Sequence, residues 1–135
     1  MNSETTSTDI RVEKTDIVKR SYAYALRVIR LYRHLEKDDV GRVLGNQLLK
    51  SGTSVGANVH EAQGGQSRAD FIAKISIAQK EAKETVYWFR IIQGAKLIDD
   101  KRLKGLFDEA EQLVRILSSI LITAKKSAKP AVPNV

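Results

Sequence analysis

The chain has 135 residues, a formal net charge of +7 and no cysteine, which excludes disulfides, thiolate zinc sites and a cysteine nucleophile. Both prolines follow Lys129, so no strong helix breaker precedes them and an all-α fold is favoured. The N-terminus lacks the apolar stretch of a signal peptide, and no apolar run reaches membrane-spanning length. We therefore expect a cytoplasmic protein with no membrane partner.

The first helical segment is expected to start at Thr15 or Asp16, since either side chain can cap a helix. Apolar residues then recur three and four positions apart, which predicts one face packed against other helices. This predicted core face consists of Val18, Tyr22, Ala25, Ile29 and Tyr32. Residues 1–14 lack this spacing, and we expect them to be flexible.

Two further segments follow in the middle of the chain. The second begins after Asp38 and Asp39 and keeps the helical spacing up to Gly64. Ser67 is the expected cap of the third, with Asp70 as an acidic partner near its positive end. The sequence therefore predicts two more helices joined by a short link.

A fourth segment starts after Asp99 and keeps its spacing to Ala124. Four helices joined by short links predict an antiparallel up-down-up-down bundle with a left-handed crossing. We assign residues 15–126 to this bundle and expect residues 127–135 to form a flexible tail.

The stretch LLKSGTSVGANVHEAQ, residues 48–63, has the glycines and hydroxyls of a phosphate-binding loop. A P-loop, however, needs a lysine after its last glycine, and Ala57 stands there. Four glycines at helical spacing lie on one ridge instead, each costing about 1 kcal/mol against alanine. We predict close packing of another helix on this ridge, with a bound phosphate backbone as the alternative. The ridge consists of Gly41, Gly45, Gly52 and Gly56.

The first and third segments carry a second apolar face beside the expected core face. In a small protein, a second apolar face on a helix usually packs against another copy of the chain. We therefore predict a homo-oligomer, with an unusually well covered single-chain core as the alternative. The predicted interface residues are Tyr24, Val28, Leu31, Ile77, Trp88 and Ile91.

Basic residues form a stripe on the first segment, opposite its apolar face. On nucleic acid such side chains neutralise phosphates and give salt-sensitive affinity with little base selectivity. The alternative is a solvated helix face. The stripe consists of Arg20, Arg27, Arg30 and His34, flanked by Lys19 and Arg33.

No pattern of a catalytic or metal site stands out. Neither His34 nor His60 has a glutamate three residues before it, as a di-iron helix bundle requires. Glu81 and Glu84 lie one turn apart, but nearby lysines favour ion pairs over acid–base work. We expect no catalytic residue, no metal and no cofactor.

Two adjoining stretches, LLKSGTSVGANVHEAQ and SRADFIAKISIAQKEAKETVYWFR, resemble a known signature. It is that of four-helix-bundle proteins encoded in intervening sequences of bacterial 23S ribosomal RNA genes. The similarity runs from about Ile17 to Ala124 and implies an antiparallel bundle assembled as a homopentameric ring. A distant relative is the accessory variability protein of diversity-generating retroelements, a basic pentamer that binds nucleic acid and a reverse transcriptase.

This resemblance favours the binding interpretation of the basic stripe. The expected function is therefore a non-enzymatic homo-oligomer that binds RNA or DNA without strong sequence preference. An adaptor for another protein, such as a reverse transcriptase, is the alternative. A salt titration separates the two, because phosphate contacts depend steeply on salt and an apolar contact does not.

Overall fold

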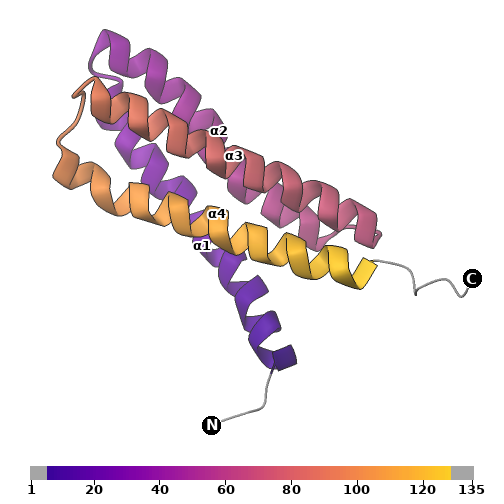
Figure 1. The fold of residues 1–135 in the computed structure, drawn as a ribbon. Helices are drawn as coiled ribbons and strands as arrows, with labels where there is room; N and C mark the ends of the chain where they lie inside the picture. The colour runs from indigo at the N-terminus through magenta and orange to yellow at the C-terminus, as the bar shows by residue number, and fades with distance from the viewer. Residues whose placement is uncertain (1–5, 129–135) are drawn as a thin grey trace, which may run out of the picture.

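The computed structural model describes the backbone of residues 6–128 and the side chains of residues 17–127. The described backbone forms four helices, α1 (Thr6–Leu35), α2 (Asp39–Gln63), α3 (Arg68–Gly94) and α4 (Asp100–Ala128). Each helix folds back along the one before it, and α1 crosses the other three at a wider angle (Figure 1). The fold is therefore all-α and bundle-like, as predicted. The outermost parts of the expected tails, residues 1–5 and 129–135, lie outside the described residues.

The cap predicted at Ser67 is present, and Asp38 caps the preceding helix in the same way. The carboxylate of Asp38 accepts a hydrogen bond from the backbone N–H of Gly41 at 2.9 Å, at the start of α2. The hydroxyl of Ser67 likewise accepts from the N–H of Asp70 at 3.1 Å, at the start of α3. Each cap satisfies a helix N–H that has no partner within the helix, which is why these helices begin where they do.

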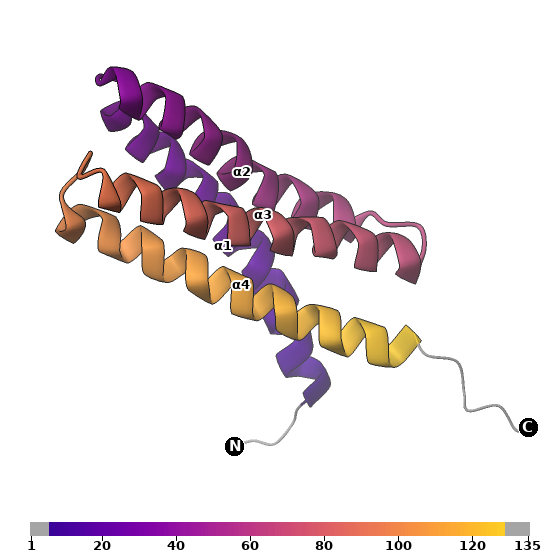
Figure 2. The same ribbon diagram turned by 45° about the horizontal axis from the view of Figure 1, so that its top comes forward.

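The first helix begins earlier than the sequence predicts. α1 starts at Thr6 rather than at Thr15 or Asp16, so the helix includes residues 6–14 of the segment expected to be flexible. No glycine or proline interrupts these residues, so a helix formed downstream can extend through them at little cost. This first part of α1 projects away from the other helices, as the turned view shows (Figure 2).

The buried face of α1 is rotated relative to the prediction. Tyr22, expected in the core, is 66% exposed, whereas Tyr24 and Val28 are 0% and Leu31 is 8% exposed. These last three were the residues of α1 predicted to contact another copy. Tyr24 and Val28 have no exposed surface with which to do so, and the prediction is wrong for these two, whereas Leu31 keeps a small exposed surface.

The glycine ridge of α2 lies against α1. A Cβ atom on Gly41 would overlap the carbonyl oxygen of Leu35, and one on Gly56 would lie 3.1 Å from the carbonyl oxygen of Ser21. Both oxygens belong to the backbone of α1, which cannot move aside without shifting the helix. The lack of side chains at these positions therefore lets the two backbones approach closely.

The same ridge sets which face of α1 is buried. A Cβ atom on Gly52 would lie 2.9 Å from both methyl carbons of Val28, and one on Gly45 would lie 3.0 Å from a ring carbon of Tyr32. The side chain of Val28 thus occupies the space that Gly52 leaves open. This fit selects one of the two apolar faces of α1 for the core.

Hydroxyl side chains in the stretch 48–63 bond to the helix itself. Each donates to a backbone carbonyl one turn earlier, as expected for serine and threonine inside a helix. The stretch is therefore a packed helix and not a phosphate-binding loop. The pairs are Ser51 with Gln47 (3.1 Å), Thr53 with Leu49 (2.8 Å) and Ser54 with Lys50 (2.7 Å).

A buried hydrogen-bonded pair joins α1 to α3 within the apolar core. The phenol of Tyr24 donates to the hydroxyl oxygen of Thr85 at 2.7 Å, and Thr85 donates to the carbonyl of Ala82 at 2.6 Å. Burial raises the pKa of Tyr24 well above its usual value, so the phenol stays a neutral donor. The pair satisfies polar atoms that would otherwise be costly to bury.

Candidate nucleic-acid interface

The contact between α1 and α4 is smaller than the contact between α1 and α2, and it includes polar side chains. Arg20 spans it. Its Nε and Nη2 atoms donate to the two carboxylate oxygens of Glu109 at 3.0 and 2.7 Å, and Nη2 also donates to Gln112 at 2.9 Å. Such a fork of two parallel hydrogen bonds is the stronger form of an arginine–carboxylate pair. Arg20 therefore holds α4 against α1, so its charge is less available for the phosphate contact predicted for it.

Two turns further along α1, Arg27 reaches across to α4 at a glycine. Its Nη2 atom lies 3.2 Å from the place that a Cβ atom of Gly105 would occupy. A side chain at this position would crowd the guanidinium. Gly105 thus leaves room for a half-buried cation on the surface between the two helices.

Arg102 of α4 adds a cation that lies outside the predicted basic stripe. Its Nη2 atom lies 2.9 Å from Nε2 of His34. A guanidinium can only donate, so in this contact Nε2 of His34 is the acceptor. Helical spacing describes each helix alone, and no signal in the sequence joins residues of α1 and α4 that lie so far apart in the chain.

These cations surround a cleft between α1 and the start of α4. The cleft has a volume of about 270 Å³, and we call it the basic cleft. Its lining residues from α4 and the preceding turn lie opposite those from α1. The full lining is Arg27, Arg30, Leu31, His34, Ile98, Arg102 and Leu106.

The other two predicted cations lie beside the cleft. Lys19 and Arg33 are exposed and share the outward side of α1 with Tyr22 and Leu26, which are 66% and 40% exposed. We call these four residues the outer face of α1. No acidic residue occurs between residues 17 and 35, so the cationic charge is not balanced within this part of the helix.

The predicted interface residues of α3 keep part of their surface exposed. Ile77 is 40% exposed, and Trp88 and Ile91 are half-buried. The indole N–H of Trp88 donates to Glu84 at 3.2 Å. Burial, and then the charge of Glu84, raise the pKa of Glu81 on the same side of the helix. α3 thus presents an apolar surface with two carboxylates in it.

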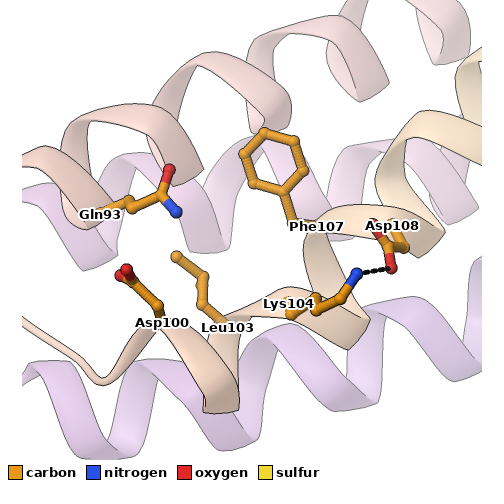
Figure 3. A pocket seen from close by; sticks show the side chains of 6 residues that line it. All are labelled: Gln93, Asp100, Leu103, Lys104, Phe107 and Asp108. Carbon is orange, nitrogen blue, oxygen red and sulfur yellow. Dashed lines mark hydrogen bonds and ion pairs between the residues drawn. The ribbon is translucent and has the colours of Figure 1, made fainter.

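A second cleft lies on the other side of α4, against α3 (Figure 3). Its volume is about 300 Å³. Lys104 is paired with Asp108 at 3.2 Å, and Asp100 adds a further negative charge. Because its ammonium is already paired and its carboxylates outnumber it, this cleft does not suit a phosphate. The remaining lining residues are Gln93, Leu103 and Phe107.

Within the part of the chain that the structure describes, no three His, Asp or Glu side chains gather as a metal site would require. None of the helices between residues 6 and 128 is long and apolar enough to cross a membrane.

Comparisons with known proteins place the chain in a family. A sequence profile described as 23S rRNA-intervening sequence protein matches residues 13–119. A solved structure from Bacteroides thetaiotaomicron, a protein of unknown function from the S23 ribosomal protein family, is 35% identical with a TM-score of 0.78. That similarity covers 82% of this chain and 98% of the other. No curated protein matches. The chain therefore belongs to the family of 23S rRNA-intervening sequence proteins.

Proposed function

We propose that this chain is a non-enzymatic cytoplasmic protein that binds RNA or DNA with little sequence preference. Binding takes place through the basic cleft and the outer face of α1. The copies assemble as a ring of up-down-up-down, left-handed bundles, and the family resemblance implies a pentamer.

One observation carries the proposal, namely that the cations of the basic cleft are not neutralised by carboxylates. Among residues 17–127, neither Arg27 nor Arg30 nor Arg102 forms an ion pair. Arg20, by contrast, faces Glu109 at 2.7 Å. Gathering like charges costs free energy unless an anion binds among them. The arrangement is therefore suited to the phosphates of a nucleic acid.

Such contacts act through the displacement of counterions. Each guanidinium that neutralises a phosphate releases a condensed cation, so affinity falls with salt by a slope of about 0.7 to 0.9 per contact. Lys19 and Arg33 of the outer face extend the same positive surface along α1. Because phosphates are the same at every nucleotide, these contacts position the strand without reading its bases.

Assembly would use the apolar surface of α3. Ile77, Trp88 and Ile91 are the predicted interface residues of α3 and still have exposed surface, and Tyr87 beside them is 55% exposed. Several copies in a ring would add their basic clefts, so that weak contacts sum to useful avidity on one strand. Ile77→Glu should then reduce the particle mass seen by light scattering. The same change at Val43, which is 62% exposed on α2, should not.

The proposal is tested by removing the cations of the cleft. Purified protein is titrated into a fluorescein-labelled oligonucleotide, and fluorescence anisotropy is followed. The triple variant Arg27→Gln, Arg30→Gln and Arg102→Gln should bind roughly tenfold more weakly or worse at low salt. A control with the same loss of charge should bind nearly as the original chain does, and equal binding by both variants would contradict the proposal. The control replaces Lys80, Lys125 and Lys126 by glutamine.

The second candidate function is that of an adaptor for another protein, such as a reverse transcriptase. Val40 and Val43 favour it, because they are 56% and 62% exposed and lie one turn apart at the start of α2. A partner held there would bind through apolar contact. Its affinity would change little with salt, in contrast to the steep dependence expected of the basic cleft.

A further inference from the structure

The geometry of the basic cleft points to a ligand more specific than a phosphate backbone. We infer that the cleft holds one unpaired nucleotide of a single strand, its base over an apolar floor and its phosphates on the surrounding guanidiniums. This inference rests on the proposed function, since it names the kind of nucleic acid that the same site takes.

The floor of the cleft is apolar. Leu31 and Leu106 line it and are 8% and 6% exposed, and Ile98, half-buried, closes it from the turn before α4. A volume of about 270 Å³ lies just below the roughly 300–1,000 Å³ of most small-molecule pockets. The space therefore suits one planar base and is too small for a dinucleotide cofactor.

The rim of the cleft carries the polar groups that a nucleotide requires. Arg27 and Arg30 stand on the α1 side and Arg102 stands on the α4 side. His34, whose Nε2 accepts from Arg102, adds a polar ring to the same lining. Guanidinium groups bind phosphates in a fork and also stack on flat rings, so one residue type serves both parts of a nucleotide.

This combination distinguishes a single strand from a duplex. In a duplex the faces of the bases are stacked inside, and an apolar floor would have nothing to contact. An unpaired base can turn out and lie on apolar or aromatic side chains, each such contact being worth about 1–3 kcal/mol.

The outer face of α1 supports the same choice of ligand. A strand that leaves the cleft along α1 meets Tyr22, whose ring is 66% exposed, with Lys19 and Arg33 on the same side. Exposed aromatic rings among cations are typical of surfaces that bind single-stranded nucleic acid. An acidic peptide could pair with the arginines, but it has no base to stack on the ring of Tyr22.

The experiment compares four probes by fluorescence anisotropy at low salt. Each probe is either labelled with fluorescein or added as a competitor. They are a single-stranded RNA of about ten nucleotides, its blunt duplex, adenosine monophosphate as a competitor, and a peptide of alternating glutamate and leucine. We expect the single strand to bind about tenfold more tightly than the duplex. We expect the mononucleotide to compete only weakly, because it lacks the contacts along α1.

Two variants test the floor and the rim separately. Ile98→Gln should weaken binding of the single strand about five- to tenfold and leave the duplex nearly unchanged. Its control is Val43→Gln, which also makes a partly exposed apolar side chain polar. Arg102→Gln should weaken both nucleic acids, and Lys125→Gln neither. Circular dichroism of each variant verifies the fold. Tyr22→Ala, at an exposed position, tests the contact of the single strand with the outer face of α1 independently of the cleft.

The possible outcomes separate this inference from the proposed function. Equal binding of duplex and single strand, with both weakened by Arg102→Gln, would overturn the inference and leave the function standing. Strong competition by the mononucleotide, or tighter binding of the peptide than of RNA, would also overturn it. If neither nucleic acid binds at low salt, the proposed function itself is wrong.

Discussion

Replacing Gly52 by alanine should destabilise the fold, because the added methyl group would meet Val28 across the contact between α1 and α2. The Cβ atom would lie 2.9 Å from both methyl carbons of Val28, whereas carbon atoms pack best at about 3.5–4.0 Å. Val28 is 0% exposed and has no solvent to move into. Such overpacking costs about 1–3 kcal/mol, and the better helix propensity of alanine returns about 1 kcal/mol. We expect a net loss of up to about 2 kcal/mol.

A double-mutant cycle tests whether that contact is the cause. Val28→Ala alone removes two buried methyl groups and should cost about 2 kcal/mol. In the double variant the new methyl group enters the vacated space. The double variant should therefore lose about 1–2 kcal/mol less stability than the sum of the two single losses.

The assay is urea denaturation at a fixed protein concentration, followed by far-ultraviolet circular dichroism. Gly94→Ala is the control, since no atom lies within 4 Å of a Cβ there, and it should not lower stability. If Gly52→Ala lowers the free energy of unfolding by the same amount in the original chain and in the Val28→Ala variant, the packing argument for the glycine ridge is refuted.

Three further outcomes follow from the structure. Thr85→Val should cost about 1–3 kcal/mol by leaving the buried phenol of Tyr24 without its partner, and adding Tyr24→Phe should recover part of the loss, as denaturation would show. Gly105→Ala should raise stability by up to about 1 kcal/mol in α4, yet weaken RNA binding, because its methyl group would crowd a guanidinium of the basic cleft. Glu81→Gln should stabilise the chain at neutral pH. Because the folded state raises the pKa of Glu81 above its usual 4.5, folding favours its protonated form, and stability is lost as pH rises through that raised pKa. In denaturation experiments, the gain in free energy of unfolding from Glu81→Gln should therefore disappear as pH falls below the ordinary pKa of glutamate.

The four helices and the glycine ridge could be predicted because both depend on local spacing. Caps at Asp38 and Ser67 are local signals as well, since each bonds a backbone N–H three residues away. The start of α1 was not predictable from apolar spacing, because residues 6–14 are helical although their sequence lacks that spacing. The absence of an apolar pattern thus does not by itself exclude a helix.

The buried face of α1 could not be chosen from the sequence, because two apolar faces lie side by side on that helix. The choice depends on Val28 fitting the space at Gly52, which is a contact between helices. The roles of the basic residues depend on α4 in the same way. Arg20 is held by Glu109 and His34 meets Arg102, and helical phase along α1 contains no information about either partner.

The central claim is that the cations of the basic cleft bind phosphates, and its most direct test is the salt dependence of RNA affinity. The dissociation constant of a single-stranded RNA is measured over a range of salt concentrations for the original chain and for Arg30→Gln with Arg102→Gln. The account predicts that the slope of log affinity against log salt becomes shallower by about 1.4, at about 0.7 for each lost contact. An unchanged slope, whatever the affinity, would contradict it.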